Sequence, residues 1–279
     1  MSVLDDIIVG VREDLEVRRA LLDDAGIAAA AAAAPPARDA FAALGGVRDG
    51  SPAERDTRLR VISEVKRKSP SKGALADIPE PSELARQYEA GGASVISVLT
   101  EQRRFGGSLE DFDAVRAAVE LPLLRKDFTV EAYQIHEARA HGADLVLLIV
   151  AALSDAQLAE FLALTRDLGM EALVEAHTEE EIDRAVAVGA RIIGVNVRNL
   201  KTLEIDRGTF GRLADRIPAD AVIVAESGVR GVEDVVGYAA DGADAILVGE
   251  ALVKDASPRQ AIASFVEQGS AAKPERVRA

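Results

Sequence analysis

Cysteine and tryptophan are both absent from this chain of 279 residues. Without cysteine the chain has no disulfides, no thiolate nucleophile and no cysteine-ligated metal. Only 3 histidines are present, and none of them lies in an H-E-x-x-H pattern. We therefore expect neither a metal nor any other cofactor.

Basic residues are outnumbered, with 33 Lys and Arg against 47 Asp and Glu, which gives a net charge of −14. Such a chain repels phosphate backbones and anionic lipid surfaces, so nucleic acid and membrane are not expected as partners. No uncharged apolar run is long enough to span a bilayer, and the acidic N-terminal stretch is unlike a signal peptide. We expect a cytoplasmic protein. The oligomeric state stays open between a monomer and a weak dimer.

Short apolar segments alternate with amphipathic stretches along most of the chain. The predicted strands are residues 61–66, 94–100, 122–128, 144–150, 172–177, 192–198, 222–227 and 245–249. Several helix-to-strand joints repeat a Gly-Ala pair, which suits the left-handed residue that ends a helix. Eight such units predict an α/β fold, a single (β/α)₈ TIM barrel. A doubly wound sheet is the alternative, but the first strand is not followed by G-x-G-x-x-G.

The predicted barrel leaves residues outside it at both ends. Residues 1–48 are predicted to form an N-terminal helical extension, because the apolar residues from Val3 to Leu15 fall at helical spacing. The alanine run 28–34 reads as a helix tail that the following prolines end. The barrel is assigned to residues 49–266, and residues 267–279 to a polar, frayed tail.

Charged side chains occupy inward positions at the downstream ends of the predicted strands. Because side chains alternate between faces, each charge can be assigned the face of an apolar residue two positions earlier, as Glu64 shares the face of Ile62. The residues placed at one mouth in this way are Glu64, Lys66, Lys126, Glu175, Asn196, Arg198 and Glu226. Buried charges must pair or serve a ligand. A network of structural ion pairs is the alternative, but seven such residues on five strands favour a site.

The last two strands carry small residues of the kind that approach phosphate. Ser227 and Gly228 follow the seventh strand and Gly249 ends the eighth, in the loops where TIM barrels commonly bind phosphate. Glu250 is awkward there, so we expect its side chain to turn away and only its backbone N–H to help. Arg103 and Arg104 are either part of a ligand loop or a solvated turn.

Six motifs together resemble one known family. They are EVKRKSPSKG, LLRKDF, ALVEAH, NVRNL, AESGV and LVGEAL, and they occur in that order on the expected strands. The chain is similar in these motifs to indole-3-glycerol phosphate synthase, a carboxy-lyase of tryptophan biosynthesis. The resemblance implies conversion of 1-(2-carboxyphenylamino)-1-deoxyribulose 5-phosphate to indole-3-glycerol phosphate, with release of carbon dioxide and water.

The resemblance also implies roles for matching residues. Lys126 is similar to the family's general acid, Glu175 to the carboxylate that serves dehydration, and Glu64 to a group that assists it. Lys66 resembles the lysine that holds the anionic substrate. The other matches are the hydroxyl-contacting positions Asn196, Arg198, Glu226 and Ser227, the site-edge position Ser69, and the phosphate cradle of Gly228 and Gly249. Glu250 departs from relatives that carry serine there.

Further expectations concern the rest of the site. Leu99, Phe105, Phe128 and Leu200 are expected to wall the aromatic ring, and the loop 67–81 to close as a lid. Two kinds of alternative function remain. One is another phosphosugar barrel enzyme, either an isomerase or an aldolase with Lys126 as the Schiff-base nucleophile. The other is a phosphosugar-binding module without catalysis.

Overall fold

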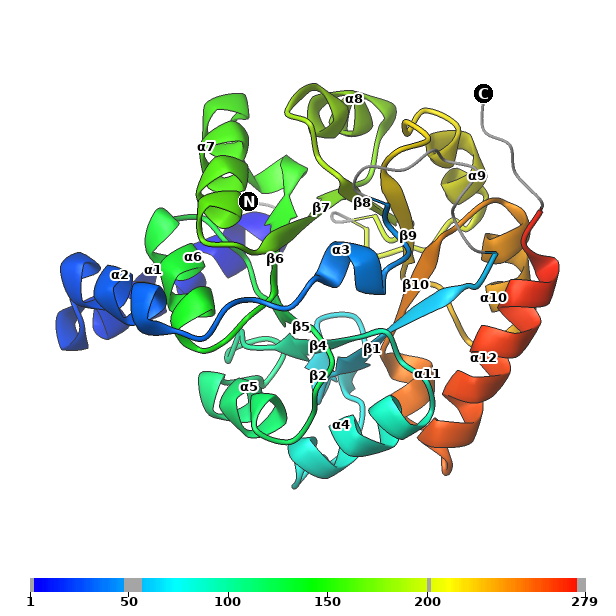
Figure 1. Cartoon of the computed structure of the whole chain (residues 1–279), viewed down its shortest axis with the longest axis horizontal. Helices are drawn as coiled ribbons and strands as arrows, with labels where there is room; N and C mark the ends of the chain where they lie inside the picture. The colour runs from blue at the N-terminus through cyan, green and yellow to red at the C-terminus, as the bar shows by residue number, and fades with distance from the viewer. Residues whose placement is uncertain (1–2, 48–56, 200–201, 275–279) are drawn as a thin grey trace.

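Eight parallel strands close into a barrel in the computed structural model (Figure 1). The structure describes residues 3–47, 57–199 and 202–274. The barrel strands are β1 (Arg60–Val65), β4 (Val95–Leu99), β5 (Leu123–Lys126), β6 (Leu145–Ile149), β7 (Glu171–Ala176), β8 (Ile192–Asn196), β9 (Val222–Glu226) and β10 (Ala245–Val248). Strand β1 pairs with both β4 and β10, which closes the circle. The predicted barrel and its eight strands are confirmed, with small differences at the strand ends.

Helices surround the strands on the outside (Figure 1). They are α4 (Pro81–Ala90), α5 (Leu109–Arg116), α6 (Ala132–Ala140), the 3₁₀ turn η2 (Val150–Ala152), α7 (Asp155–Asp167), α8 (Glu179–Ala187), α9 (Gly208–Ala214), α10 (Val232–Ala240), α11 (Glu250–Val253) and α12 (Pro258–Ala272). The predicted glycine joints behave as expected, since Gly142 and Gly189 take left-handed φ angles of 82° and 74° where α6 and α8 end. A short hairpin of β2 (Lys68–Ser69) and β3 (Gly73–Ala74), which we did not predict, lies in the loop after β1.

Side chains alternate along each strand between the barrel interior and the surrounding helices. Ile62, Leu124 and Leu173 belong to an interior cluster, whereas Val61 and Leu123 belong to the cluster that packs under the helices. This is the period of two on which the sequence argument depends. On several strands, the inward-facing residues are therefore apolar in the core and polar at the downstream end.

A short helix closes the N-terminal end of the barrel. Helix α3 (Ala40–Ala43) begins with Asp39, whose carboxylate accepts a hydrogen bond from the backbone N–H of Ala42. Phe41 and Leu44 join the interior cluster, and the guanidinium of Arg191 lies 5.2 Å from the centre of the Phe41 ring. The upstream end is therefore filled by side chains, and a ligand can enter the barrel from the opposite end.

Within residues 3–47, which the structure describes, the N-terminal extension contains three helices. Helix α1 (Val3–Leu21) packs Ile7 and Val11 against Val130, and α2 (Asp24–Ala33) ends just before the prolines, as predicted. The boundary assigned near residue 48 lies outside the described residues.

The C-terminal helix extends beyond the residue where we expected the polar tail to begin. Helix α12 continues past residue 267 to Ala272. Its buried Gly269 packs closely on Leu59, and the hydroxyl of Ser270 accepts a 2.9 Å hydrogen bond from the Leu59 backbone N–H. These contacts hold the helix end against the start of β1.

Phe41→Ala tests the role of α3 as the plug of the barrel. Phe41 is 2% exposed, so its truncation should leave a cavity and lower the free energy of unfolding by about 3–5 kcal/mol. Urea unfolding measures this loss. Val17→Ala is the matched control, because Val17 on α1 is 64% exposed and should change stability by less than about 0.5 kcal/mol. Equal effects of the two substitutions would contradict the plug.

Candidate active site

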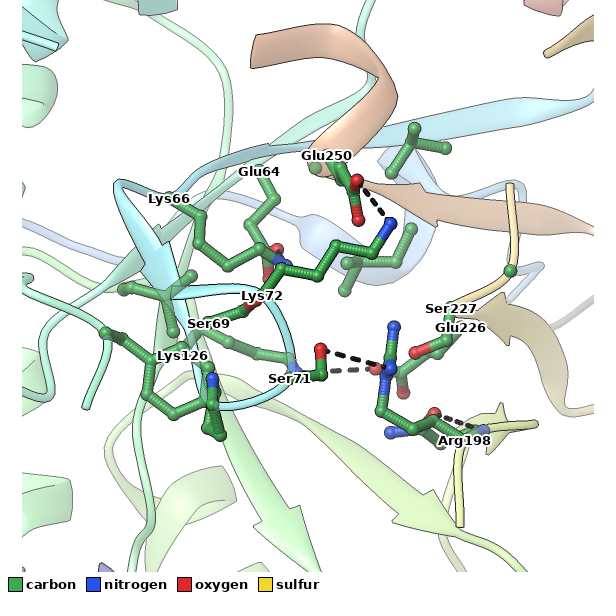
Figure 2. A pocket seen from close by; sticks show the side chains of 18 of the residues that line it. Glu64, Lys66, Ser69, Ser71, Lys72, Lys126, Arg198, Glu226, Ser227 and Glu250 are labelled. Carbon is green, nitrogen blue, oxygen red and sulfur yellow. Dashed lines mark hydrogen bonds and ion pairs between the residues drawn. The ribbon is translucent and has the colours of Figure 1, made fainter. Parts of the chain in front are cut away.

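A cavity of about 460 Å³ opens at the C-terminal ends of the strands. The structure brings nearly all of the predicted site residues to its wall (Figure 2). Those that line it are Glu64, Lys66, Ser69, Leu99, Phe105, Lys126, Phe128, Glu175, Asn196, Arg198, Glu226, Ser227, Gly228, Gly249 and Glu250. Leu200 lies outside the described residues, so its placement stays a prediction. The roles of these residues also stay predictions, but their meeting at one mouth is a feature of the structure.

Lys126 lies at the centre of the charged cluster. Its Nζ atom is 3.4 Å from Oε2 of Glu175 and 3.5 Å from Oε2 of Glu226, and both carboxylates are almost fully buried. Burial alone would lower the pKa of Lys126, but attraction to Glu175, Glu226 and Glu64 outweighs it and raises that pKa. Lys126 is therefore a charged ammonium group at neutral pH, with protons available for donation.

The two carboxylates beside Lys126 differ in their charge state. Burial raises the pKa of Glu226, and repulsion from Glu175 raises it further, well above its usual value. Burial also acts to raise the pKa of Glu175, but Lys126 and His177 oppose this and lower the pKa overall. Two close carboxylates in a buried site cannot both ionise easily. The shifts therefore favour the anion at Glu175 and the proton at Glu226.

Small residues make room for these acids. A side chain at Gly194 on β8 would collide with Oε1 of Glu226, and a side chain at Gly249 would collide with Oε2 of Glu64. Glu64 forms an ion pair with Lys66, whose Nζ lies 3.2 Å from where a Cβ atom at position 249 would be. Glycine at these two positions is therefore a condition for packing the charged cluster into the barrel mouth.

Glu175 is supported from two sides. Asn196 hydrogen-bonds to its carboxylate, and Nε2 of His177 lies 3.5 Å from its Oε1. His177 is anchored in turn by Glu181, which accepts from the backbone N–H of His177 at 2.7 Å and lies 3.2 Å from its Nδ1. His177 does not line the cavity. It therefore supports Glu175 from outside the cavity.

The backbone after β9 adopts an unusual conformation. Ser227 and Gly228 have φ angles of 71° and 81°, and a left-handed conformation costs a residue such as serine about 1–2 kcal/mol. Arg207 donates from Nε to the Gly228 carbonyl oxygen at 2.7 Å, and the Tyr238 hydroxyl donates to the Ser227 carbonyl oxygen at 3.1 Å. A Cβ atom at Gly228 would lie 2.7 Å from that hydroxyl oxygen. Strain of this kind gathers at functional sites, where surrounding contacts hold it.

Two expectations about charged side chains need correction. Glu250 does not turn away from the cavity, because its Oε1 binds the ammonium groups of Lys72 at 2.7 Å and Lys254 at 2.8 Å. Arg103 does not line the cavity, and its side chain is not simply solvated. It forms ion pairs with Glu13 and Asp14 of α1, and so ties the loop after β4 to the N-terminal extension.

The apolar wall of the cavity contains residues that sequence reasoning missed. The predicted pair Phe105 and Phe128 is present, with ring centres 6.0 Å apart. The further apolar residues are Val3, Leu4, Ile7, Leu75, Leu147, Ile149, Leu203, Ile205, Val229, Leu247, Val248 and Ala251. The helical spacing of α1 identified its apolar face, but nothing in that spacing indicated that the face reaches the cavity.

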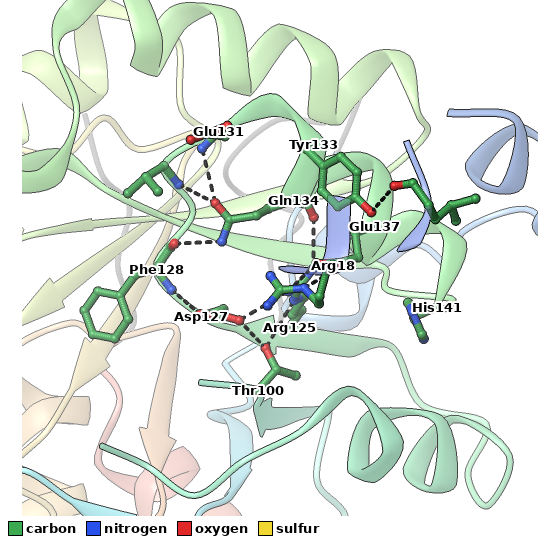
Figure 3. Close-up of polar contacts among 12 residues, drawn as sticks. Arg18, Thr100, Arg125, Asp127, Phe128, Glu131, Tyr133, Gln134, Glu137 and His141 are labelled. Carbon is green, nitrogen blue, oxygen red and sulfur yellow. Dashed lines mark hydrogen bonds and ion pairs between the residues drawn. The ribbon is translucent and has the colours of Figure 1, made fainter. Parts of the chain in front are cut away.

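A buried polar network lies behind Lys126 on the outer side of β5 (Figure 3). Arg125 donates to Oε2 of Glu137 at 2.8 Å and to Oδ2 of Asp127 at 3.2 Å. Glu137 also accepts from Arg18 of α1 at 2.7 Å, and Thr100 donates to Asp127 at 2.5 Å. The charges of Arg125 and Asp127, which flank Lys126 in the sequence, are thus satisfied within this network. These contacts hold the backbone of β5, and the network does not compete for the charged groups inside the barrel.

Within the described part of the chain, no group of three or more His, Asp or Glu residues is placed to hold a metal ion. No helix in those residues is both long and apolar enough to cross a membrane.

Comparisons with known proteins agree with this geometry. The family model for indole-3-glycerol phosphate synthase matches residues 4–265. The chain is 69% identical over 272 residues to an indole-3-glycerol phosphate synthase from Paenarthrobacter aurescens, covering 98% of both chains. It is 60% identical over 279 residues to one from Rhodococcus opacus, covering 99% of this chain and 100% of that relative.

Solved structures with little sequence similarity share the fold. A thiamine phosphate pyrophosphorylase from Pyrococcus furiosus superposes with a TM-score of 0.60 at 15% identity, over 77% of this chain and 96% of that one. A 3-hexulose-6-phosphate synthase gives 0.58 at 18% identity, over 78% and 100%. At this identity the likeness concerns the fold alone.

Glu226→Gln tests the proton assigned to Glu226. Folding raises the pKa of Glu226. Above the usual carboxyl pKa, the folded chain therefore keeps a proton on Glu226 that the unfolded chain has released. The stabilisation is complete below that usual value and is lost as pH rises toward the raised pKa. The free energy of unfolding of the unaltered chain should thus fall relative to that of Glu226→Gln as pH rises above the usual carboxyl value. Urea unfolding at a series of pH values measures the difference, and parallel pH profiles would contradict the assignment.

Proposed function

The chain belongs to the indole-3-glycerol phosphate synthase family, and from this premise we propose how its cavity performs the family's reaction. The enzyme is a carboxy-lyase of tryptophan biosynthesis. It converts 1-(2-carboxyphenylamino)-1-deoxyribulose 5-phosphate to indole-3-glycerol phosphate, carbon dioxide and water. The placement of Lys126 between two buried carboxylates at the cavity wall supports this proposal most strongly.

Ring closure needs a proton donor at the sugar carbonyl. The ring carbon that bears the carboxylate attacks the carbonyl carbon, and a new carbon–carbon bond forms as electrons move onto the carbonyl oxygen. Lys126 donates a proton to this oxygen, because its raised pKa keeps it charged until a stronger base forms beside it. The bond to the carboxylate then breaks, carbon dioxide leaves, and its electron pair restores the aromatic ring.

Dehydration completes the indole ring. The hydroxyl group formed in the first step leaves as water, while a proton is removed from the neighbouring ring carbon. Glu175 is the base for this proton, because its lowered pKa keeps it anionic and because it contacts Lys126 directly. Glu64 assists by holding Lys66, whose ammonium group supplies the proton with which the hydroxyl group leaves as water. Glu226, as the neutral acid, keeps the cluster from carrying an uncompensated charge.

The remaining side chains bind the substrate. Phe105 and Phe128 lie beside each other and provide an apolar wall for the carboxyphenyl ring. Arg198, Asn196 and Ser227 contact hydroxyl groups, and Ser69 lies at the edge of the site. The small residues Gly228 and Gly249 let phosphate approach their backbone N–H groups. We place this reaction in the cytoplasm.

The alternative functions fit these observations less well. A Schiff-base aldolase needs Lys126 as a neutral amine, whereas its carboxylate neighbours favour the charged form. An isomerase releases no carbon dioxide. A binding module would have no need for the acid and base at Lys126 and Glu175.

Lys126→Met and Glu175→Gln test the proposed roles. General acid or base help is typically worth about 10² to 10⁴ in rate, so each variant should lose kcat by about that factor while keeping its fold. The assay mixes purified chain with 1-(2-carboxyphenylamino)-1-deoxyribulose 5-phosphate and follows indole fluorescence together with carbon dioxide release. Lys68→Met is the control, since Lys68 is exposed and lies outside the cavity. Near-normal turnover by Lys126→Met would remove Lys126 from the mechanism.

A further inference from the structure

The loop after β1 reaches across the cavity and carries an exposed lysine to its phosphate end (Figure 2). In this loop the Ser71 hydroxyl accepts a 3.3 Å hydrogen bond from Arg198, and Lys72 binds Glu250 at 2.7 Å. Glu250 directly follows Gly249, the cradle residue beside Lys66. The tip of the loop is therefore held over the segment assigned to phosphate by two separate contacts.

The charges of the cavity explain why a further cation is needed there. The substrate carries a carboxylate and a phosphate, and the chain as a whole has a net charge of −14. Lys66 and Lys126 are already engaged with buried carboxylates. Arg207 and Arg230 share Asp234 beside Gly228, on the β9 side of the cavity. Beside Gly249, the cavity-lining cations Lys72 and Lys254 are not held by a buried carboxylate.

Lys72 and Lys254 meet this need because of the way in which Glu250 holds them. Both ammonium groups bind the same oxygen, Oε1 of Glu250, so two positive charges share one negative charge. Each ammonium group has three N–H donors, and Glu250 accepts from only one of each. The group of three therefore has a net positive charge and spare donors next to the cradle.

We propose that Lys72 is a phosphate-binding residue delivered by the loop after β1, and that Glu250 is the positioning residue that holds it over Gly249. Lys254 lies one helical turn from Glu250 on the same side and steadies its carboxylate. The carboxylate that is awkward for phosphate in the sequence is thus the group that brings a cation to it. This inference rests on the proposed function for the identity of the phosphorylated substrate.

Lys72→Met tests the ligand role with inorganic phosphate as the probe. Loss of a charge-assisted hydrogen bond to phosphate should raise the Kd for phosphate about tenfold or more. Isothermal titration calorimetry on the full chain measures it. With the phosphorylated substrate, KM should rise by a similar factor while kcat stays within about twofold, since phosphate does not react. Lys72 is 53% exposed on its side chain, so the substitution leaves the fold intact.

Lys68→Met is the matched control in the same loop. Lys68 lies against Gly106 and not in the cavity, so both Kd and KM should stay within about twofold of the unaltered chain. Equal phosphate affinity in Lys72→Met and Lys68→Met would overturn the ligand role. Absence of measurable phosphate binding by the unaltered chain would overturn it as well.

Glu250→Gln separates positioning from simple repulsion. In the unaltered background it should weaken phosphate binding about two- to fivefold, because Lys72 is released. In the Lys72→Met background it should leave binding unchanged or tighten it, because only repulsion remains. Tighter binding in both backgrounds would overturn the positioning role.

These results can be told apart from failure of the proposed function. The calorimetric readout needs no turnover, so a chain that binds phosphate through Lys72 but forms no indole product would contradict only the assigned reaction. Normal indole formation, with KM unchanged in Lys72→Met, would contradict only this inference.

Discussion

The site depends on one buried interaction, the contact of a lysine ammonium with two carboxylates at the mouth of the barrel. Lys126 lies 3.4 Å from Glu175 and 3.5 Å from Glu226. Burying any one of these charges alone would be costly. With both glutamates ionised, the two carboxylates and the single ammonium group would carry a net negative charge. The raised pKa of Glu226 and the lowered pKa of Glu175 favour an arrangement in which one cation faces one anion. The same arrangement gives chemistry, since it holds a charged acid and an ionised base side by side.

The surrounding fold is shaped to permit this contact. Glycine at 194 and 249 leaves space for the carboxylates of Glu226 and Glu64, where any larger side chain would collide with them. The network around Arg125 satisfies the outward charges of β5, so they do not compete for the inner ones. Helix α3 fills the opposite end, which keeps the barrel interior apolar below the charged layer. Function and stability therefore occupy different ends of the same strands.

Much of this follows from the sequence, because strand alternation is a local rule. The face of Ile62 determines that Glu64 points inward, and the same reasoning places Lys126 and Glu175. Contacts between distant segments have no such rule. Helix α1 showed an apolar face, but only tertiary packing brings it to the cavity. The orientation of Glu250 was predicted wrongly because Lys72, far away in sequence, binds it.

The protonation state of Lys126 is the most direct test of the account. A titration of the Lys126 Nζ group by nitrogen-detected NMR would follow it in the unaltered chain. The account predicts that the group stays charged above the pH at which an ordinary lysine is half deprotonated, because Glu175 and Glu226 outweigh the effect of burial. Deprotonation of Lys126 near or below that pH would contradict it, because the carboxylates would then not hold the proton that ring closure requires.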